Sequence, residues 1–369
     1  MVDTRAFYDY LIKSSMNFFV GVPDSLLKDF CSCVSVNSKE KNIIAANEGN
    51  AIAIASGYNI STKNYAVVYM QNSGLGNAIN PILSLVDEEV YNIPMLMIIG
   101  WRGEPNVKDE PQHIKQGKVT LKLLDCIGVR YLILEDDFKK QIDYCRDYME
   151  KTNKPIAIIV KKRIFSRYMS KLDCNSFSLT REKALEEILL SLGNDDYIVS
   201  TTGKTSREIF EIREKNNQNH SNDFLTVGSM GHASSIAFGI SLGTDKNIYC
   251  IDGDGAFLMH MGGLAVAVQN AKNNFRYIMI NNGCHDSVGG QPTIGFDINI
   301  KSILIGFGLK YVYEVRRLED LKEALTKIKS QNKSALIVNV RQGSRSDLGR
   351  PSIIPVENKK DFSNKIRGF

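Results

Sequence analysis

The chain has 369 residues, of which 43% are hydrophobic and 24% charged, and this is the composition of an ordinary globular protein large enough for two full cores. Its net charge of +5 is mild and no dense basic run is visible, so we expect neither nucleic-acid nor membrane binding. No apolar run reaches the roughly 18 residues of a membrane span and the N-terminus lacks a signal-peptide core, so a cytoplasmic location is expected.

In the first half, short apolar runs bounded by turn residues alternate with helical patterns. The expected strands are 18–20, 43–46, 65–70, 95–100 and 155–160. The expected helices are 4–15, 25–30, 51–57, 73–85, 121–128 and 139–151. Residues 101–118 read as a polar loop with two prolines, and a loop of this length is usually functional or disordered.

The second half repeats the alternation after a polar stretch without a period, where we expect a linker at 166–179 between domains 1–165 and 180–369. The expected strands are 197–201, 224–227, 248–251, 277–280 and 335–340. The expected helices are 181–192, 233–242, 258–269 and 318–330, with Thr180 as a cap of the first. The polar tail from Arg341 is expected to be mobile at its end. The pattern predicts an α/β protein with two doubly wound parallel-sheet domains and no middle domain.

The stretch 248–293 carries the strongest chemical signal. Gly253, Asp254 and Gly255 lie just past the end of the expected strand 248–251, and Asn282 lies just past the end of the next, 277–280. Both positions lie at carboxyl ends of parallel strands, where open α/β sheets bind ligands. Asp254, Asn282 and a backbone carbonyl just beyond offer hard oxygens for Mg²⁺, whose shell a diphosphate and water would complete. The glycines allow backbone N–H groups to approach phosphate closely.

This GDG…NN pair resembles the signature of thiamine-diphosphate enzymes, although two turns on an ordinary α/β sheet would be the structural alternative. Several longer runs resemble the phosphonopyruvate decarboxylase family, with sulfopyruvate decarboxylases as near relatives. These runs are FFVGVPDSLL, NEGNAIAIASGY, YMQNSGLGNAINP, WRGEPNVKDEPQH, TTGKTSREIF, VGSMGHASSIA and NNGCHDSVGGQPT. The resemblance covers nearly the whole chain, with a pyrimidine-type domain first and a diphosphate-type domain second. Two positions depart from it, because Asn106 stands where glycine is expected and Cys284 where alanine is expected.

The resemblance implies thiamine diphosphate and Mg²⁺ as cofactors, with Asp254, Asn282 and the Cys284 carbonyl as metal ligands. Glu48 would be the catalytic glutamate that protonates the aminopyrimidine, whose amino group then takes the thiazolium proton. The Gly228 carbonyl would bond the aminopyrimidine. The other expected cofactor contacts are Asn72, Thr202, Gly203, Lys204, Thr205, Ser229, Met230, Gly253, Gly255 and Ala256. The structural alternative for Glu48 is a carboxylate that stabilises a helix N-terminus.

The implied reaction is non-oxidative decarboxylation of 3-phosphonopyruvate to phosphonoacetaldehyde and CO₂, within phosphonate biosynthesis. A phosphonate dianion needs positive charge and N–H donors. The expected substrate contacts are Asp24, Arg102, Lys108, Gln112, His113, Lys118, His285, Ser287 and Gln291. We expect His113 and His285 to act in catalysis as well. A solvated surface charge is the alternative for each basic residue taken alone.

Glu48 and Asp254 lie in different halves, yet both are expected to contact one cofactor. In the resembled family the two ends of the cofactor come from different subunits. We therefore expect a homodimer, or a homotetramer of dimers, with active sites at the subunit interface. A sulfopyruvate decarboxylase, another 2-keto acid decarboxylase or a carboligase would be alternative functions. From a different class, a nucleotide-binding or regulatory protein on a doubly wound sheet stays open.

Overall fold

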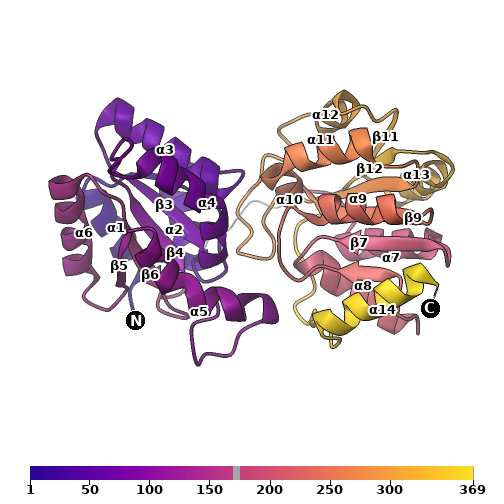
Figure 1. The fold of residues 1–369 in the computed structure, drawn as a ribbon, viewed down its shortest axis with the longest axis horizontal. Coiled ribbons are helices and arrows are strands. Elements are labelled where there is room, and N and C mark those ends of the chain that lie inside the picture. Colours follow the sequence, from indigo (N-terminus) through magenta and orange to yellow (C-terminus); the bar gives the residue numbers. More distant parts are fainter. Residues whose placement is uncertain (169–174, 369) are drawn as a thin grey trace. The chain divides into compact units, whose positions relative to one another are not determined.

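The computed structural model describes residues 1–168 and 175–368, and the chain divides into two compact units (Figure 1). One unit comprises Met1–Leu172 with Ser287–Gln291, and the other comprises Asp173–Asp286 with Pro292–Phe369. Each unit contains one six-stranded parallel sheet with helices on both faces, so the predicted fold class is confirmed. The domain limits 1–165 and 180–369 stay a prediction. Of the predicted linker 166–179, residues 169–174 lie outside the described residues.

The sheet of the first unit has the strand order β2-β1-β3-β4-β6-β5. Its strands are β1 (Phe18–Gly21), β2 (Asn42–Ile44), β3 (Ala66–Gln71), β4 (Leu96–Gly100), β5 (Arg130–Ile133) and β6 (Ile156–Val160). The helices are α1 (Thr4–Lys13), α2 (Lys28–Asn37), α3 (Glu48–Thr62), α4 (Leu75–Pro81), α5 (Pro111–Cys126) and α6 (Phe138–Thr152). Three short helical turns are η1 (Lys39–Lys41), η2 (Asn72–Gly74) and η3 (Ile82–Val86).

Strand β4 shows why the central strands read as continuous apolar runs. All of its residues are buried, because alternate side chains enter two different cores. Leu96 and Ile98 pack in the core beneath α1, α2 and α6, whereas Met97 and Ile99 pack in the core beneath α3, α4 and α5. The sheet is therefore covered on both faces, and polar groups concentrate where its strands end.

The sheet of the second unit has the order β11-β12-β10-β9-β7-β8, which is the first topology read from the opposite edge. Its strands are β7 (Asp196–Ser200), β8 (Asp223–Leu225), β9 (Asn247–Gly253), β10 (Phe275–Asn281), β11 (Tyr311–Val315) and β12 (Ser334–Asn339). The helices are α7 (Arg181–Ser191), α8 (Lys204–Lys215), α9 (Ala233–Gly243), α10 (Asp254–Met259), α11 (Met261–Asn270), α12 (Ile300–Gly306), α13 (Leu318–Ser330) and α14 (Pro355–Arg367). Thr180 caps α7 as predicted, since its side chain accepts a hydrogen bond from the Lys183 N–H.

Each sheet contains one pair of neighbouring strands whose next strands lie in opposite directions along the sheet. In the first unit this pair is β1 and β3, and in the second it is β7 and β9. Loops that leave such a pair diverge and open a crevice at the carboxyl edge of the sheet. Asp24 and Asn72 follow β1 and β3, while Thr202 and Asp254 follow β7 and β9. The topology thus places predicted site residues at the crevice of each sheet.

The loop predicted at 101–118 is wrong in its second part, because α5 begins at Pro111. Proline suits the first turn of a helix, where its missing N–H is not needed. The buried face of α5 consists of His113, Gly117, Thr120 and Leu124. Because most of these residues are polar or small, the helix lacks the apolar stripe by which sequence patterns detect a helix. Gln112, His113 and Lys118 consequently lie on a helix.

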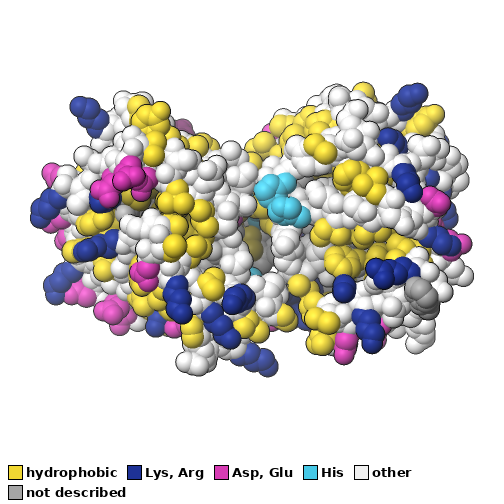
Figure 2. Space-filling model, viewed as in Figure 1, with side chains coloured by type: hydrophobic (Ala, Val, Ile, Leu, Met, Phe, Trp, Pro, Cys, Tyr) yellow, Lys and Arg dark blue, Asp and Glu magenta, His cyan; other side chains and the backbone are white. Residues whose placement is uncertain are grey.

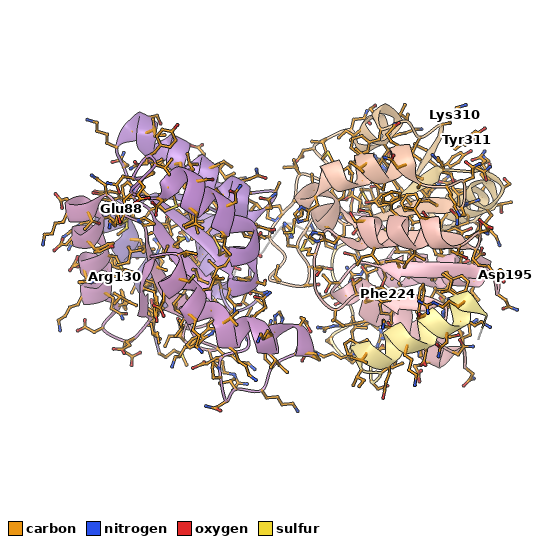
Figure 3. All side chains as sticks on the ribbon, viewed as in Figure 1. Glu88, Arg130, Asp195, Phe224, Lys310 and Tyr311 are labelled. Atoms are coloured by element: carbon orange, nitrogen blue, oxygen red, sulfur yellow. The ribbon has the colours of Figure 1, made fainter. Side chains whose placement is uncertain are left out.

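The mobile end predicted for the tail is also wrong, because α14 packs against β8. Phe362 makes edge contacts with Tyr197 and Phe224, with ring centroids 5.6 and 5.7 Å apart. Figure 3 shows Phe224 beside this helix. The buried Asn358 donates from Nδ2 to the Asp223 carbonyl (2.7 Å) and accepts from the Leu225 N–H (3.1 Å). The helix is polar over most of its surface, and this pattern favoured the prediction of a loose tail.

Among the described residues, no helix has both the length and the apolar character that a bilayer crossing requires. On the face of the molecule seen in Figure 2, Lys and Arg side chains are spread among acidic and neutral ones. The charge of the chain is therefore distributed on this face, and the local surroundings of single charged groups matter more than the total.

Candidate active site

Asp254 is the acid of the GDG turn. It begins α10 directly after β9, and its side chain is 2% exposed. Burial raises its pKa to about 6, even though the Thr293 hydroxyl and backbone N–H groups, among them that of Asn282, donate to the carboxylate. Within residues 1–168 and 175–368, no Lys or Arg forms a salt bridge with it. Asp254 is thus a buried acid whose charge lacks a cationic partner in the described chain.

The end of β10 lies beside this carboxylate. Asn281 donates to the Gly295 carbonyl (2.8 Å) and to the Asn339 side chain (3.1 Å), which ties β10 to β12 and to the following loop. The Asn282 side-chain oxygen accepts from the Cys284 N–H at 3.2 Å. Asp254, Asn282 and the backbone at Cys284 therefore belong to one small cluster. Burial raises the pKa of the Cys284 thiol well above its usual value, so this side chain stays a thiol.

Met230 and His285 meet over Gly255. A Cβ added at Gly255 would lie 2.9 Å from the His285 Cε1 and 3.3 Å from the Met230 Cε, so the close approach requires glycine. Ser229 has a left-handed backbone (φ 52°), and the loop after it returns to α9. Burial lowers the pKa of His285 to about 4, so its imidazole is neutral near pH 7. This loop, the GDG turn and His285 therefore meet at the carboxyl edge of the sheet.

The loop after β7 supplies backbone donors. The Thr202 hydroxyl already donates to the Val227 carbonyl (2.8 Å), which joins this loop to the loop after β8. Lys204 opens α8, a helix of 12 residues, and Thr205 is buried in its first turn. The first N–H groups of such a helix have no partner within the helix and favour anions. The side chain of Thr202 is thus occupied, while the start of α8 suits a phosphate.

In the first unit, Glu48 begins α3 and is 5% exposed. Its Oε2 accepts from the Asn77 Nδ2 at 2.7 Å. A Cβ added at Gly74, the last residue of η2, would overlap the Glu48 carboxylate, so the turn that leads into α4 packs directly on it. Asn47, the cap of α3, accepts from the Asn50 N–H. The carboxylate is therefore fixed by a neighbouring helix, beyond any effect on its own helix terminus.

Arg102 is held by a partly buried ion pair that the sequence did not reveal. Its guanidinium binds both oxygens of Asp109 and donates from Nη1 to the Ser25 hydroxyl (2.7 Å). Asp109 also accepts from the N–H groups of Gly103 and Glu110, at 2.8 Å each. Burial raises the pKa of Asp109, but these donors outweigh it and bring the pKa to about 2. Arg102 is thus fixed in place, and two of its five N–H groups make no hydrogen bond to another described residue.

Asp24 and His113 lie near Arg102 and share an unusual feature. Each is buried, and the Asp24 Oδ1 and the His113 Nδ1 have no hydrogen-bond partner among the residues that the structure describes. Burial raises the pKa of Asp24 to about 6, against the opposing charge of Arg102. Burial and the Arg102 charge together lower the pKa of His113 to about 4. Unpaired buried polar atoms are costly and need an explanation, and a bound ligand that pairs with both groups would supply one.

The remaining predicted residues differ in their placement. The Asn72 amide bridges the Arg102 backbone and the Thr120 hydroxyl, with contacts of 2.8–3.1 Å, so its polar atoms are already used. Lys108, Lys118 and Ser287 are exposed, whereas Gln112 is half-buried. Gln291 is fully buried, and neither of its side-chain polar atoms has a partner in the described part of the chain. Gly228 lies in the loop after β8, Gly253 is the last residue of β9, and Ala256 lies in the first turn of α10.

Comparison with known proteins identifies the family. The N-terminal TPP binding domain of thiamine pyrophosphate enzymes matches residues 3–123, and the C-terminal TPP binding domain matches residues 201–339. A phosphonopyruvate decarboxylase from Streptomyces viridochromogenes is 31% identical over 93% of this chain and 89% of its own length. The chain belongs to the thiamine pyrophosphate enzyme family. It is therefore an enzyme, and its relatives make it a carboxy-lyase.

Other relatives of this thiamine pyrophosphate enzyme have related names. A phosphonopyruvate decarboxylase from Streptomyces hygroscopicus is 31% identical over 93% of this chain and 88% of its own length. A sulfopyruvate decarboxylase from Methanosarcina acetivorans is 24% identical over 94% and 92%. A solved structure of benzoylformate decarboxylase from Polynucleobacter necessarius aligns over 92% of this chain and 98% of that chain, with 14% identity and a TM-score of 0.38.

The residues around Asp254 fit a hydrated magnesium ion. A carboxylate, the Asn282 amide oxygen and a backbone carbonyl are hard oxygen donors, which Mg²⁺ prefers to sulfur or imidazole. In the described ranges no group of three His, Cys, Asp or Glu side chains could hold a metal by itself. Mg²⁺ usually keeps water and phosphate ligands, so few protein ligands are needed. The buried, unpaired charge of Asp254 agrees with a cation at this position.

Sequence reasoning missed several residues of this thiamine pyrophosphate enzyme that hold the predicted ones. Asp109 fixes Arg102, Asn77 binds Glu48, and Thr293 donates to Asp254. All three lie inside runs that carried the family resemblance, so membership of those runs was the available signal. Arg181 and Asp286 form another ion pair, beside Cys284. Sequence reasoning missed Arg181 because this residue lies outside the loops at the strand ends.

Proposed function

We propose that the chain catalyses the Mg²⁺-dependent decarboxylation of 3-phosphonopyruvate to phosphonoacetaldehyde and CO₂, as a cytoplasmic enzyme of phosphonate biosynthesis. The observation that carries the proposal is the match to two phosphonopyruvate decarboxylases at 31% identity over 93% of the chain. The sulfopyruvate decarboxylase that matches a similar length is only 24% identical. We therefore assign to this chain the substrate class of the more similar relatives, the phosphonopyruvate decarboxylases.

The second unit would hold the diphosphate end of the cofactor. Asp254, Asn282 and the Cys284 carbonyl would bind Mg²⁺, while the first turn of α8 and the glycines at 253 and 255 would donate to phosphate oxygens. Bound thiamine diphosphate supplies a nucleophilic thiazolium carbon and an electron sink for the bond that CO₂ leaves. Met230, pressed against Gly255, would support its shape.

Glu48 would hold the proton that activates the cofactor. Its Oε2 is fixed by Asn77, so the carboxylate has one orientation and would be available to a ring nitrogen of the cofactor. Its burial keeps water away from that contact. Gly74 leaves room for the carboxylate and for no additional carbon atom beside it. The geometry supports Glu48 as an acid–base group beyond the role of a helix-terminal charge.

The groups near Arg102 would bind the substrate. Its two unused N–H groups would meet phosphonate oxygens, and its pair with Asp109 would keep the guanidinium from turning away. His113 and His285 are neutral near pH 7, so they would act as hydrogen-bond donors and proton carriers and would add no charge. Lys108 and Lys118, both exposed, would contribute only long-range attraction for the dianion.

We further propose a homodimer, or a homotetramer built from dimers, whose active sites lie between subunits. Sulfopyruvate decarboxylase of Methanocaldococcus jannaschii has alpha and beta subunits that match 43% and 50% of this chain over 93% and 95% of their own lengths. Chains of half this length thus work as subunits of one assembly. Because Glu48 and Asp254 belong to different units, a site shared between copies would satisfy both.

One assay tests the proposed function. Release of CO₂ is measured from phosphonopyruvate, sulfopyruvate and pyruvate, with and without thiamine diphosphate and Mg²⁺, and Glu48→Gln serves as the inactive control. We expect release only with both cofactors, and the highest kcat/KM with phosphonopyruvate. A higher kcat/KM with sulfopyruvate would contradict the proposed substrate. Carbon–carbon bond formation with an added aldehyde, in place of aldehyde release, would indicate a carboligase.

A further inference from the structure

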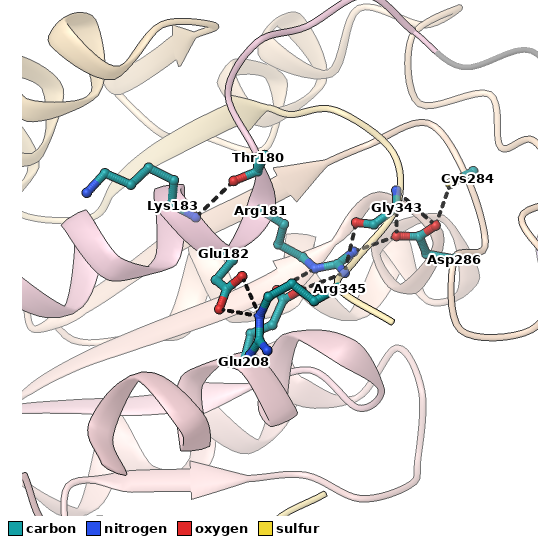
Figure 4. A network of polar contacts seen from close by, with 9 residues as sticks. All are labelled: Thr180, Arg181, Glu182, Lys183, Glu208, Cys284, Asp286, Gly343 and Arg345. Carbon is teal, nitrogen blue, oxygen red and sulfur yellow. Dashed lines mark hydrogen bonds and ion pairs between the residues drawn. The ribbon is translucent and has the colours of Figure 1, made fainter. Parts of the chain in front are cut away.

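Arg181 is the centre of a buried polar network in the second unit (Figure 4). It is the first residue of α7 and is 4% exposed. Its guanidinium donates from Nε and Nη2 to both oxygens of Glu208 on α8, at 2.7 and 3.0 Å. From the opposite side, its Nη1 donates to the Asp286 Oδ2 at 2.9 Å. A single arginine thus connects two helices to the segment that follows β10.

Asp286 connects this arginine to the segment that carries the predicted metal ligands. It accepts from the Gly343 N–H at 3.1 Å, and the Cys284 thiol donates to its Oδ1 at 3.6 Å. Asp286 directly follows His285, whose ring packs on Gly255. Asn175 donates to the carbonyl of Asn282 at 3.3 Å, which holds the other end of the segment. Residues 282–286 are therefore held at both ends.

Arg181, Glu208 and Asp286 are largely removed from water, so each charge among them needs a physical reason. Glu208 alone would neutralise Arg181 through a two-pronged pair, so the charge balance of the fold does not need a second acid there. Asp286 adds a second negative charge to the buried group, and the desolvation of that charge is costly. Such a cost is understandable if the carboxylate fixes a backbone whose position matters for function.

We propose that Arg181 and Asp286 are positioning residues for the cofactor site, an inference that rests on the proposed function. Asp286, anchored on Arg181, fixes the backbone of 282–286, so the Cys284 carbonyl and the His285 ring keep their places beside Asp254 and Gly255. Glu208 has a different task, because it neutralises Arg181 and joins α7 to α8. Within this network Glu208 thus stabilises the fold, whereas Asp286 holds the cofactor site in position.

Three variants of the full-length chain distinguish these tasks. Asp286→Asn keeps the shape of the side chain and leaves the Arg181–Glu208 pair intact, so the fold is preserved. Glu208→Gln weakens the pair and leaves Asp286 in contact with Arg181. Arg345→Gln is the matched control, because Arg345 also joins α7 to α8, through Glu182 and Glu211, and does not contact Asp286. Each variant is measured by thermal unfolding, by calorimetric titration of thiamine diphosphate with Mg²⁺, and by amide hydrogen exchange without ligands.

For Asp286→Asn we expect an almost unchanged Tm, faster exchange confined to 282–286, and Mg²⁺-dependent cofactor affinity lower by about 10–100-fold, as is typical when a group that orients a metal ligand is lost. Glu208→Gln should lower Tm and keep the affinity, and Arg345→Gln should change neither. Wild-type exchange and affinity in Asp286→Asn would overturn the inference, as would affinity losses that merely follow Tm in both variants. If the wild-type chain itself binds no cofactor, the proposed function fails, and the exchange data alone then decide whether Asp286 orders the segment.

Discussion

Two buried carboxylates, Glu48 and Asp254, have contrasting surroundings. Glu48 shares one oxygen with the Asn77 amide and is pressed by Gly74. Asp254 accepts a hydroxyl and several N–H groups, yet burial still raises its pKa to about 6. The first environment fixes the orientation of the Glu48 carboxylate, the group that we propose transfers a proton. The second leaves a negative charge that a cation would stabilise.

The metal assignment is tested at single residues. Asp254→Ala or Asn282→Ala should weaken Mg²⁺-dependent binding of thiamine diphosphate by more than about 100-fold, beyond the 10–100-fold loss that follows when only a supporting residue is removed. Calorimetric titration measures the affinity, and the circular dichroism spectrum should stay that of the wild type. Wild-type affinity in either variant would remove that residue from the metal site.

Asp24 should make folding stability depend on pH. Its pKa is about 6 in the folded chain and about 3.8 when unfolded, so its neutral form is favoured by folding. The resulting stabilisation is fully present below pH 3.8 and is lost as the pH rises through 6. The shift of about 2 pKa units corresponds to about 3 kcal/mol.

Asp24→Asn removes this ionisation, so its urea midpoint should rise relative to wild type between pH 4 and pH 7, and the relative rise corresponds to at most about 3 kcal/mol. Unfolding curves of both proteins at pH 4, 5, 6 and 7 provide the comparison. A constant difference between the two proteins across this range would show that Asp24 keeps its ordinary pKa.

At the scale of elements, the starts of α3 and α4 form one packed unit around Glu48. Gly74 has an ordinary helical backbone (φ −68°), so alanine is excluded there only by the Glu48 side chain. Gly74→Ala should displace this carboxylate, lower kcat by at least about 10-fold, and cost about 1–3 kcal/mol of stability through overpacking.

Gly76→Ala, two residues away in α4, is the matched control. A Cβ at Gly76 meets no atom within 4 Å, so this variant should keep full activity and gain up to about 1 kcal/mol from helix propensity. Steady-state kinetics and urea unfolding of both variants suffice. Equal activity of the two variants would mean that the packing of Gly74 on Glu48 has no catalytic importance.

The elements also show which parts of the fold the sequence could predict. Central strands such as β4 and β10 were found because all of their residues are buried and each contains an uninterrupted apolar run, 96–99 in β4 and 277–280 in β10. The edge strands β5 and β11 were missed, since their exposed positions carry residues such as Arg130 and Tyr311. The metal and glutamate candidates follow from motifs, whereas Asp109 and Arg181 could not be assigned because their roles depend on contacts between distant segments.

At the scale of the whole molecule, the chain carries two sets of site residues in two units of equal topology. If each cofactor lies between two copies, an inactive Glu48→Gln chain and an inactive Asp254→Ala chain should complement each other. A mixed dimer would contain one intact site of two. Glu48→Gln alone should lose roughly two orders of magnitude or more in kcat.

The two variants are mixed under conditions of subunit exchange, and exchange is verified with differently tagged chains. We expect the mixture to recover about a quarter of wild-type activity, because random pairing makes half of the dimers mixed and each has one working site. Exchange without any recovery would mean that Glu48 and Asp254 of one chain serve the same cofactor.

The contact between Asn358 and β8 has a consequence for association between chains. Strand β8 lies at the edge of its sheet, and an uncovered edge exposes N–H and C=O groups to strands of other molecules. The Asn358 amide binds one donor and one acceptor of this edge, as a neighbouring strand would do. Removal of α14 would therefore leave the crevice residues in place and still promote aggregation, through strand pairing between chains.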